Sequence, residues 1–382
     1  TLLFIKPKDR GSVEETFYPW TATFDRWKKE GHLENVPDDI FNETGKKVNN
    51  ADKYLSSLMA DGVFKYEKFL GFDGVKRVSF NLPLRPFNKT IIEDTDDYVI
   101  QGDDDGWTRK YYKNSSIVET IRPVVTCPED WYNLKEAAYK ELDKYYTDDN
   151  IQKIYTRFKD GHEKGDYSLR MNITGFFWTP RTLLGIEEHL YAFYDYPEMM
   201  HDMNNFFLDV YFEKLGIILD ILPADVLYIM EDLSGCNGPM LSPELFDEFV
   251  GAYYKRLVPF LMSKGVGNVF VDTDGDFLKL IPNFICSGIE GFLPMDVNAG
   301  MDIVEVRKYY PRLKFIGGFN KLAIEAGREA IDKEFKRLMP VIRQGGYIPG
   351  CDHQVTHATP FENYKYYISK LKECMHEAGS ML

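Results

Sequence analysis

The sequence of 382 residues has few cysteines, no excess of basic residues and no long apolar run. Its five cysteines are widely spaced and form no close CxxC pair, which is typical of a reducing compartment rather than of a disulfide framework. The net charge of −14 argues against nucleic acid or an anionic membrane as a partner, because both repel an acidic surface. No segment approaches the ~20 apolar residues that span a bilayer, and no signal-peptide pattern is present. We therefore expect a soluble, cytoplasmic protein.

The glycine-rich motifs that bind nucleotide phosphates are missing as well. No GxGxxG follows a predicted strand, and no GxxxxGK followed by Ser or Thr occurs, so a dinucleotide or P-loop fold has no support. Apolar residues, in contrast, make up 44% of the chain and aromatic residues 15%, which supports a large core and offers aromatic pocket walls. The length fits one barrel-sized domain or two ordinary ones.

Short apolar segments alternate regularly with helical segments from Leu169 onwards. Strands are predicted at 169–177, 226–230, 269–271, 291–293, 313–316 and 347–348, and helices at 198–222, 243–264, 303–310, 328–343 and 361–378. Six such β–α steps indicate a parallel sheet covered by helices. An N-terminal strand at Thr16–Trp20 and one more from the first half would make eight. We therefore predict an α/β fold, a (β/α)8 TIM barrel.

The first part of the chain departs from this alternation. A helix at Phe24–Gly31 follows the N-terminal strand and forms an N-terminal extension. From about residue 69 to residue 125, prolines and turn sequences such as FDG and DDDG predict antiparallel hairpins. We therefore predict one barrel domain over 1–382 with a hairpin insertion at about 69–125.

In such barrels the reacting groups come from the carboxyl ends of the strands. Those ends here hold polar and aromatic residues: Phe176, Phe177, Trp178, Glu231, Asp232, Asp272, Asp274, Asp296, Phe319, Asn320, Cys351 and His353. Each has a structural alternative, such as a helix cap for the acids or a core position for Cys351 and Phe319. Their joint occurrence at six strand ends favours a functional site.

The stretch NVFVDTDG, residues 268–275, is the centre of this prediction, because a buried strand ends there in two carboxylates and a glycine. Asp272, Asp274, Cys351 and His353 together offer the oxygen, sulfur and nitrogen ligands that Zn²⁺ accepts, so we predict zinc bound by these four residues or by some of them. An acid–base pair of a carboxylate and a histidine without metal, as in a decarboxylase or hydrolase, is the alternative.

Several segments resemble a known family. They include NITGFFWTPRTLLGIEEHLYAFYDYPEMMHDM, VDTDGDFLKLIP and GGYIPGCDHQVTHATPFENYKYY. They resemble the uroporphyrinogen decarboxylase superfamily, and more narrowly its anaerobic branch of corrinoid-dependent methyltransferases, including O-demethylase components that act on methoxylated aromatics. The resemblance runs from about Asp25 to the C-terminus and implies a (β/α)8 barrel with N-terminal additions.

The resemblance has two departures. Thiol-methylating relatives bind zinc with a His-x-Cys after one strand and a Cys after the last, whereas here Asp272 and Asp274 occupy the first pair and Cys351 the last position. Carboxylates make a harder, more Lewis-acidic metal, which is better suited to an ether oxygen than to a thiol. The RQAGR stretch with which uroporphyrinogen decarboxylases grip substrate carboxylates has no counterpart before Tyr66.

The resemblance therefore implies methyl transfer from a methoxylated aromatic compound to the cobalt of cobalamin. The corrinoid would be carried by a separate protein, because no Asp-x-His-x-x-Gly signature occurs in this chain. We expect Asp272, Asp274, Glu231 and His353 to be catalytic. The residues expected to bind substrate are Tyr18, Trp20, Phe176, Phe177, Trp178, Asp232, Asp296, Phe319 and Asn320. A decarboxylase, or a barrel without catalytic activity, is the alternative.

Overall fold

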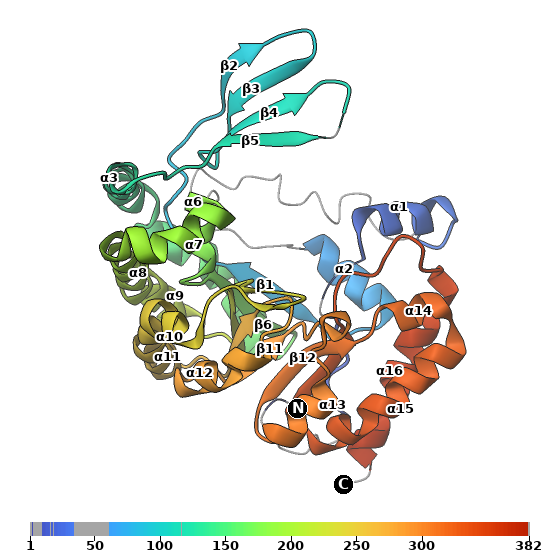
Figure 1. Cartoon of the computed structure of the whole chain (residues 1–382). Coiled ribbons are helices and arrows are strands. Elements are labelled where there is room, and N and C mark those ends of the chain that lie inside the picture. Colours follow the sequence, from blue (N-terminus) through green and yellow to red (C-terminus); the bar gives the residue numbers. More distant parts are fainter. Residues whose placement is uncertain are drawn as a thin grey trace.

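The computed structural model describes residues 2, 10–15, 17, 19–33, 61–115 and 117–380. At its centre, parallel strands follow one another in sequence order around a curled sheet (Figure 1). They are β1 (Val75–Ser79), β6 (Ser168–Thr174), β7 (Val226–Met230), β10 (Val269–Asp272), β11 (Gly291–Leu293), β12 (Lys314–Phe319) and β13 (Tyr347–Cys351). The six strands predicted from Leu169 onwards are all present. The α/β class with a parallel sheet is therefore confirmed.

Closure of the sheet into a barrel differs from the prediction. β1 and β13 are the edges of the seven-stranded sheet, and within the described ranges no strand joins them. Residues 11–15 lie between these edges instead: the Asp73 backbone N–H donates to Val13 at 2.8 Å, and the Cys351 N–H donates to Glu15 Oε1 at 2.8 Å. Of the predicted strand Thr16–Trp20, residues 19 and 20 are not in a strand, and residues 16 and 18 lie outside the described part. The eight-stranded barrel stays a prediction.

Helices cover the outer face of the curled sheet (Figure 1). After the early helices α1 (Thr21–Lys29) and α2 (Asp61–Leu70), they are α3 (Pro128–Tyr145), α4 (Asp148–Tyr155), α5 (Lys159–Glu163), α6 (Trp178–Leu184), α7 (Ile186–Asp195), α8 (Pro197–Val210), α9 (Gly216–Ile221), α10 (Pro243–Phe246), α11 (Ala252–Ser263), α12 (Ile281–Cys286), α13 (Ile303–Tyr309), α14 (Leu322–Ala326), α15 (Arg328–Gln344) and α16 (Phe361–Ser380). Two π-helical turns, Tyr211–Leu215 and Asp247–Gly251, interrupt the predicted helices 198–222 and 243–264. None of the described helices has the length and apolar character to cross a membrane.

Side chains along each strand alternate between the inside of the curl and the outer helices. Phe270, Ile316 and Ile348 belong to a small inner cluster. Phe319, three residues after Ile316, faces outwards and contacts Phe335 of α15 and Tyr367 of α16, with ring centroids 4.7 and 4.8 Å apart. This alternation decides which strand-end residues meet inside the curl.

The range 69–125 contains two kinds of structure. β1 belongs to the parallel sheet. The strands β2 (Thr90–Asp94), β3 (Tyr98–Gly102), β4 (Thr108–Tyr112) and β5 (Val118–Arg122) form an antiparallel sheet of their own, which projects away from the curled sheet (Figure 1). A short hairpin of β8 (Ser234–Gly235) and β9 (Gly238–Pro239) follows β7.

Candidate functional site

Three aspartates gather where β7 and β10 end, and we call Asp232, Asp272 and Asp274 the acid cluster. Asp272 is the last residue of β10 and lies on the same inward face as Phe270. Burial, followed by the charges of Asp274 and Asp232, raises the pKa of Asp272 well above its usual value. Burial and the charges of Asp232 and Asp296 raise the pKa of Asp274 to about 6. Asp272 and Asp274 therefore keep their protons to a higher pH than ordinary carboxyl groups, which lose them near pH 4.

The backbone of two loops brings the acid cluster together. The Asp274 N–H donates to Asp232 Oδ1 at 3.2 Å, and the Leu233 N–H donates to Thr273 Oγ1 at 3.3 Å. Asp232 has φ 47°, a left-handed conformation that costs energy in a non-glycine residue. At Gly275, with φ 77°, a Cβ would come within 2.5 Å of the Ser234 carbonyl oxygen, so only glycine lets the loops approach this closely.

His353 and Lys321 bring nitrogen atoms to the acid cluster. His353 Nε2 lies 3.7 Å from Asp274 Oδ2, and burial together with the nearby charge of Lys321 lowers the pKa of His353. The rings of Phe17 and Trp20 lie 5.3 and 6.0 Å from the His353 ring. Sequence reasoning missed Lys321, although its place directly after the GGFN turn at the end of β12 could have indicated it.

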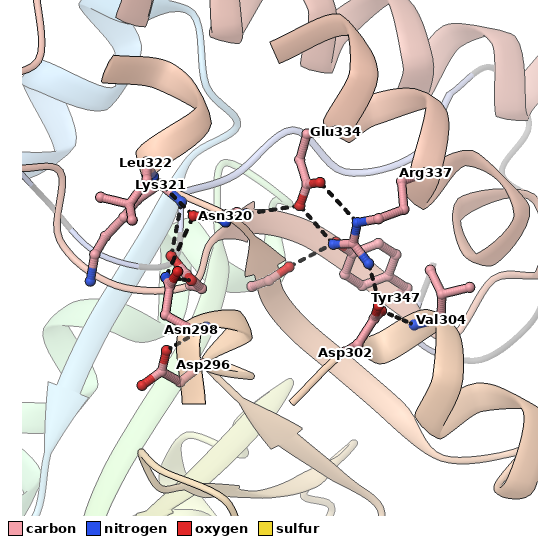
Figure 2. Close-up of polar contacts among 12 residues, drawn as sticks. Asp296, Asn298, Asp302, Val304, Asn320, Lys321, Leu322, Glu334, Arg337 and Tyr347 are labelled. Carbon is pink, nitrogen blue, oxygen red and sulfur yellow. Dashed lines mark hydrogen bonds and ion pairs between the residues drawn. The ribbon is translucent and has the colours of Figure 1, made fainter. Parts of the chain in front are cut away.

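Asp352 anchors the neighbouring loops, of which Figure 2 labels Asn298, Asn320 and Lys321. Its Oδ1 accepts a hydrogen bond from the Lys321 N–H at 3.0 Å, and its Oδ2 accepts one from Asn298 Nδ2 at 3.0 Å. Burial raises the pKa of Asp352 to about 6. Asp296 and Asn320, both predicted to bind substrate, serve as caps: Asp296 Oδ1 accepts from the Asn298 N–H at 3.1 Å, and Asn320 Oδ1 accepts from the Leu322 N–H at 3.0 Å. Their carboxylate and amide oxygens hold loop backbone in place.

Glu231 faces away from the acid cluster. Its carboxylate accepts backbone N–H groups of Phe176, Phe177 and Trp178 at 3.0, 2.9 and 2.8 Å, and the Tyr254 hydroxyl donates to it as well. The side chain is fully buried, and burial raises its pKa to about 7. Glu231 thus ties β7 to the start of α6, a structural position that differs from the expected catalytic one.

The predicted aromatic wall does not form as expected. Phe176, Phe177 and Phe319 are buried in the core, because their backbone positions turn them towards the outer helices. Trp20 is half exposed and lies beside His353. Trp178 is partly buried and lines a separate cavity. Tyr18 lies outside the described residues.

The four predicted zinc ligands do not converge. Cys351 is buried on the outer face of β13, where its Sγ lies 3.7 Å from Glu15 Oε2 and near Tyr367. Asp272 faces inwards, so the thiol and this carboxylate lie on opposite faces of the sheet. In the part of the chain that the structure describes, no group of three or more His, Cys, Asp or Glu side chains is arranged to hold a metal ion. The predicted ligand set therefore does not fit zinc.

A cavity of about 300 Å³ lies where the antiparallel sheet meets the carboxyl end of β6. Apolar and aromatic side chains form much of its wall, and Arg85, Asp105, Arg109 and four smaller polar residues complete it. Its lining is Asn81, Leu82, Leu84, Arg85, Asp105, Trp107, Arg109, Thr174, Trp178, Thr179, Thr182 and Leu183. The volume suits a single aromatic ring with its substituents.

Two arginines on inner strands were not predicted from the sequence. Arg77 of β1 is buried, and its Nη1 lies 2.8 Å from Glu67 Oε1. Arg170 of β6 is buried as well and pairs with Glu14. Because both guanidinium groups already have carboxylate partners, neither offers an unpaired charge to a substrate carboxylate.

The chain is similar to several known proteins. Residues 120–374 match the family described as uroporphyrinogen decarboxylase (URO-D). Among solved structures, a methyltransferase from Methanosarcina mazei is similar at 14% identity and a TM-score of 0.54, over 96% of this chain and 95% of that one. A protein from Listeria monocytogenes assigned as a vitamin-B12-independent methionine synthase has 13% identity and a TM-score of 0.39, over 99% of both chains. No protein with a curated function matches the sequence. At this identity the first structure shows a shared fold.

Proposed function

The chain belongs to the uroporphyrinogen decarboxylase family, and from this premise we propose that it is a methyltransferase. The proposed donor is a methoxylated aromatic compound. The proposed acceptor is the cobalt of a reduced corrinoid that a separate protein carries, so the corrinoid is a substrate of this enzyme. The observation that carries the proposal is the acid cluster at the ends of β7 and β10, where the buried Asp272 carboxyl group lies beside two other acids that, with burial, raise its pKa.

A protonated acid meets the main chemical demand of this reaction, because a phenolate leaves a methyl group poorly. In the proposed step the methyl carbon bonds to cobalt(I), which supplies the electron pair. The carbon–oxygen bond breaks towards oxygen, and the phenolate takes the proton of the Asp272 carboxyl group. Water returns a proton to Asp272 after the phenol leaves. The charge of Asp274 next to Asp272 favours the protonated form before the reaction.

The charge around the acid cluster favours an aromatic ether over a porphyrinogen. A polycarboxylate macrocycle would bring several negative charges to three aspartates, and each unpaired charge would cost several kcal/mol on burial. Lys321 is the cation whose charge acts on Asp274, Asp352 and His353. A neutral aromatic ether brings no charge to the acid cluster, so its binding does not require an unpaired charge to be buried.

No step of this proposal uses zinc, because Cys351 lies on the opposite face of the sheet from Asp272 and no three candidate ligands among the described residues are arranged to hold a metal ion. His353 Nε2 instead lies 3.7 Å from Asp274 Oδ2, where the neutral imidazole can accept a hydrogen bond from the product phenol. Its lowered pKa keeps the imidazole neutral at pH 7, and a neutral imidazole can accept.

The experiment is a substrate screen without added metal. The purified protein is incubated with reduced cobalamin and a panel of methoxyarenes labelled in the methyl carbon, and with uroporphyrinogen and coproporphyrinogen in parallel. We expect the label to appear on cobalt and the free phenol to form in equal amount. Release of carbon dioxide from a porphyrinogen, with no label on cobalt from any ether, would contradict the proposal and favour decarboxylation.

A further inference from the structure

The cavity beside β6 is separate from the acid cluster but adjacent to it. Thr174, the last residue of β6, lines the cavity, and its register partner is Met230, which directly precedes Glu231 and Asp232. Arg181 connects the two places: its guanidinium lies 5.2 Å from the Trp178 ring centroid, and its Nη1 donates to the Asp232 carbonyl. A molecule in the cavity therefore lies next to the loop that carries Asp232.

The two tryptophans of the cavity are held in place. Trp107 Nε1 donates to the Thr182 carbonyl at 2.8 Å, which fixes the antiparallel sheet against α6. The Trp178 backbone N–H donates to the buried Glu231 carboxylate at 2.8 Å, and the Arg181 guanidinium lies 5.2 Å from the centroid of the Trp178 ring. The two indole rings line the cavity together with Leu82 and Leu84, and an aromatic ring stacks on or packs edge-on against such walls.

The two arginines of the cavity differ in their partners. Arg109 pairs with Asp103 at 2.5 Å and with Asp105 at 2.8 Å, so its charge is already balanced. Arg85 is exposed at the cavity rim, and within the described ranges no carboxylate pairs with it. An unpaired guanidinium beside an aromatic enclosure can bind a carboxylate with two parallel hydrogen bonds.

We propose that this cavity binds one aromatic ring that carries a carboxylate, with the ring between Trp107 and Trp178 and the carboxylate on Arg85. The inference goes beyond the proposed function, because the cavity is separate from the acid cluster, and it rests on that function only in its choice of methoxylated rings as probes. It also assigns a role to the antiparallel insertion, which contributes Trp107 and completes the cavity wall.

Binding of two matched ligands to the full chain tests this assignment without any corrinoid. Calorimetry compares 4-methoxybenzoate with 4-methoxybenzamide, which has nearly the same shape but no charge. We expect the acid to bind about tenfold more tightly than the amide, because a charge-assisted pair is stronger than a neutral hydrogen bond. Equal affinity of the two ligands, or no binding of either, would overturn the proposal. Sulfate is added as a competitor to test whether negative charge alone is sufficient for binding. If sulfate displaces the bound acid as effectively as benzoate does, the proposal is overturned.

Three variants locate the contact. Arg85→Met should weaken binding of the acid about tenfold and binding of the amide less than about twofold. Arg85→Lys should restore most of the lost affinity for the acid. Arg256→Met, at an exposed arginine on α11, is the matched control and should change neither affinity. Equal weakening of both ligands by Arg85→Met would contradict the contact.

The outcomes separate this inference from the proposed function. If the acid binds as expected but no ether transfers its methyl group to cobalt, the cavity assignment stands and the methyltransferase proposal fails. If methyl transfer occurs but Arg85→Met weakens binding of the acid and of the amide equally, the methyltransferase proposal stands and the cavity assignment fails.

Discussion

Glu231 and Asp272 are carboxylates at the ends of two neighbouring parallel strands, yet they meet opposite surroundings. Glu231 lies between the sheet and the helices, where three backbone N–H groups and the Tyr254 hydroxyl donate to it. Asp272 faces inwards, and its neighbours are the acids Asp274 and Asp232. Among the described residues no hydrogen-bond donor reaches the Asp272 carboxylate. Hydrogen-bond donors thus hold the Glu231 side chain in place, whereas neighbouring negative charges destabilise the ionised form of Asp272.

This difference separates structural acids from reactive ones. A carboxylate that accepts four hydrogen bonds has no capacity left for a substrate and serves to join β7 to α6. A carboxyl group without donors, beside other negative charges, binds a proton and can give it to a developing oxyanion. A substitution of Glu231 should therefore lower mainly the stability of the fold, and a substitution of Asp272 should lower mainly the rate of methyl transfer.

The largest expected effect is on stability, from Glu231→Ala. Removing this carboxylate leaves three N–H groups and a tyrosine hydroxyl without an acceptor, which should lower the free energy of unfolding by about 3–4 kcal/mol. Urea unfolding followed by circular dichroism measures it. A loss below about 1 kcal/mol would show that the donors find other acceptors and that the contrast with Asp272 is overstated.

Asp272→Asn should act on rate and leave stability intact. We expect at least about a hundredfold loss of methyl transfer, because an amide cannot supply the acidic proton. The melting temperature should stay nearly the same, since the amide replaces a carboxyl group of similar shape that is already neutral. Asp276→Asn is the matched control, because Asp276 caps the Leu278 N–H and asparagine caps equally well. Full activity of Asp272→Asn would remove this residue from the mechanism.

Asp274→Asn tests the coupling within the acid cluster. The charge of Asp274 is the second cause, after burial, of the raised Asp272 pKa. Without it, the Asp272 pKa should fall, and the alkaline limb of the pH–rate profile should move down by about one pH unit. An unchanged limb would show that the two carboxyl groups do not interact.

Asp274→Asn should also raise the stability of the folded protein, by an amount that depends on pH. The folded-state pKa of Asp274 is raised to about 6, so its ionisation destabilises the native protein as pH rises from about 4 to about 6. Asp274→Asn should therefore gain stability relative to the native chain over this interval and keep the gain above it. Parallel unfolding curves of both proteins at pH 4, 5, 6 and 7 measure the gain.

The smallest effect is expected from Cys351→Ser. The thiol is buried on the outer face beside Glu15, so the substitution should cost about 1 kcal/mol of stability or less and leave methyl transfer unchanged. His353→Ala, two residues further on at the inner site, should slow the reaction. Equal loss of activity in both variants would indicate that Cys351 takes part in the site after all.

The periodic elements were predictable, but the directions of single side chains were not. The six strands from β6 to β13 follow from short apolar runs between helical ones. Glu231, Phe319 and Cys351 were assigned to the inner site because they stand at strand ends, yet a shift of one residue along a strand reverses the face. Trp107 could not be found either, because it reaches the cavity beside β6 from the loop before β4 rather than from the end of a parallel strand.

The central claim, that Asp272 protonates the leaving phenolate, is tested most directly by varying the leaving group. Methyl transfer is measured for native protein and for Asp272→Asn with a series of anisoles whose phenols range from weakly to strongly acidic. We expect the deficit of Asp272→Asn to shrink from about a hundredfold for the weakly acidic phenols to near unity for nitrophenols, which leave without a proton. A constant deficit across the series would contradict the claim, because it would mean that Asp272 acts on binding or folding rather than on the departing oxygen.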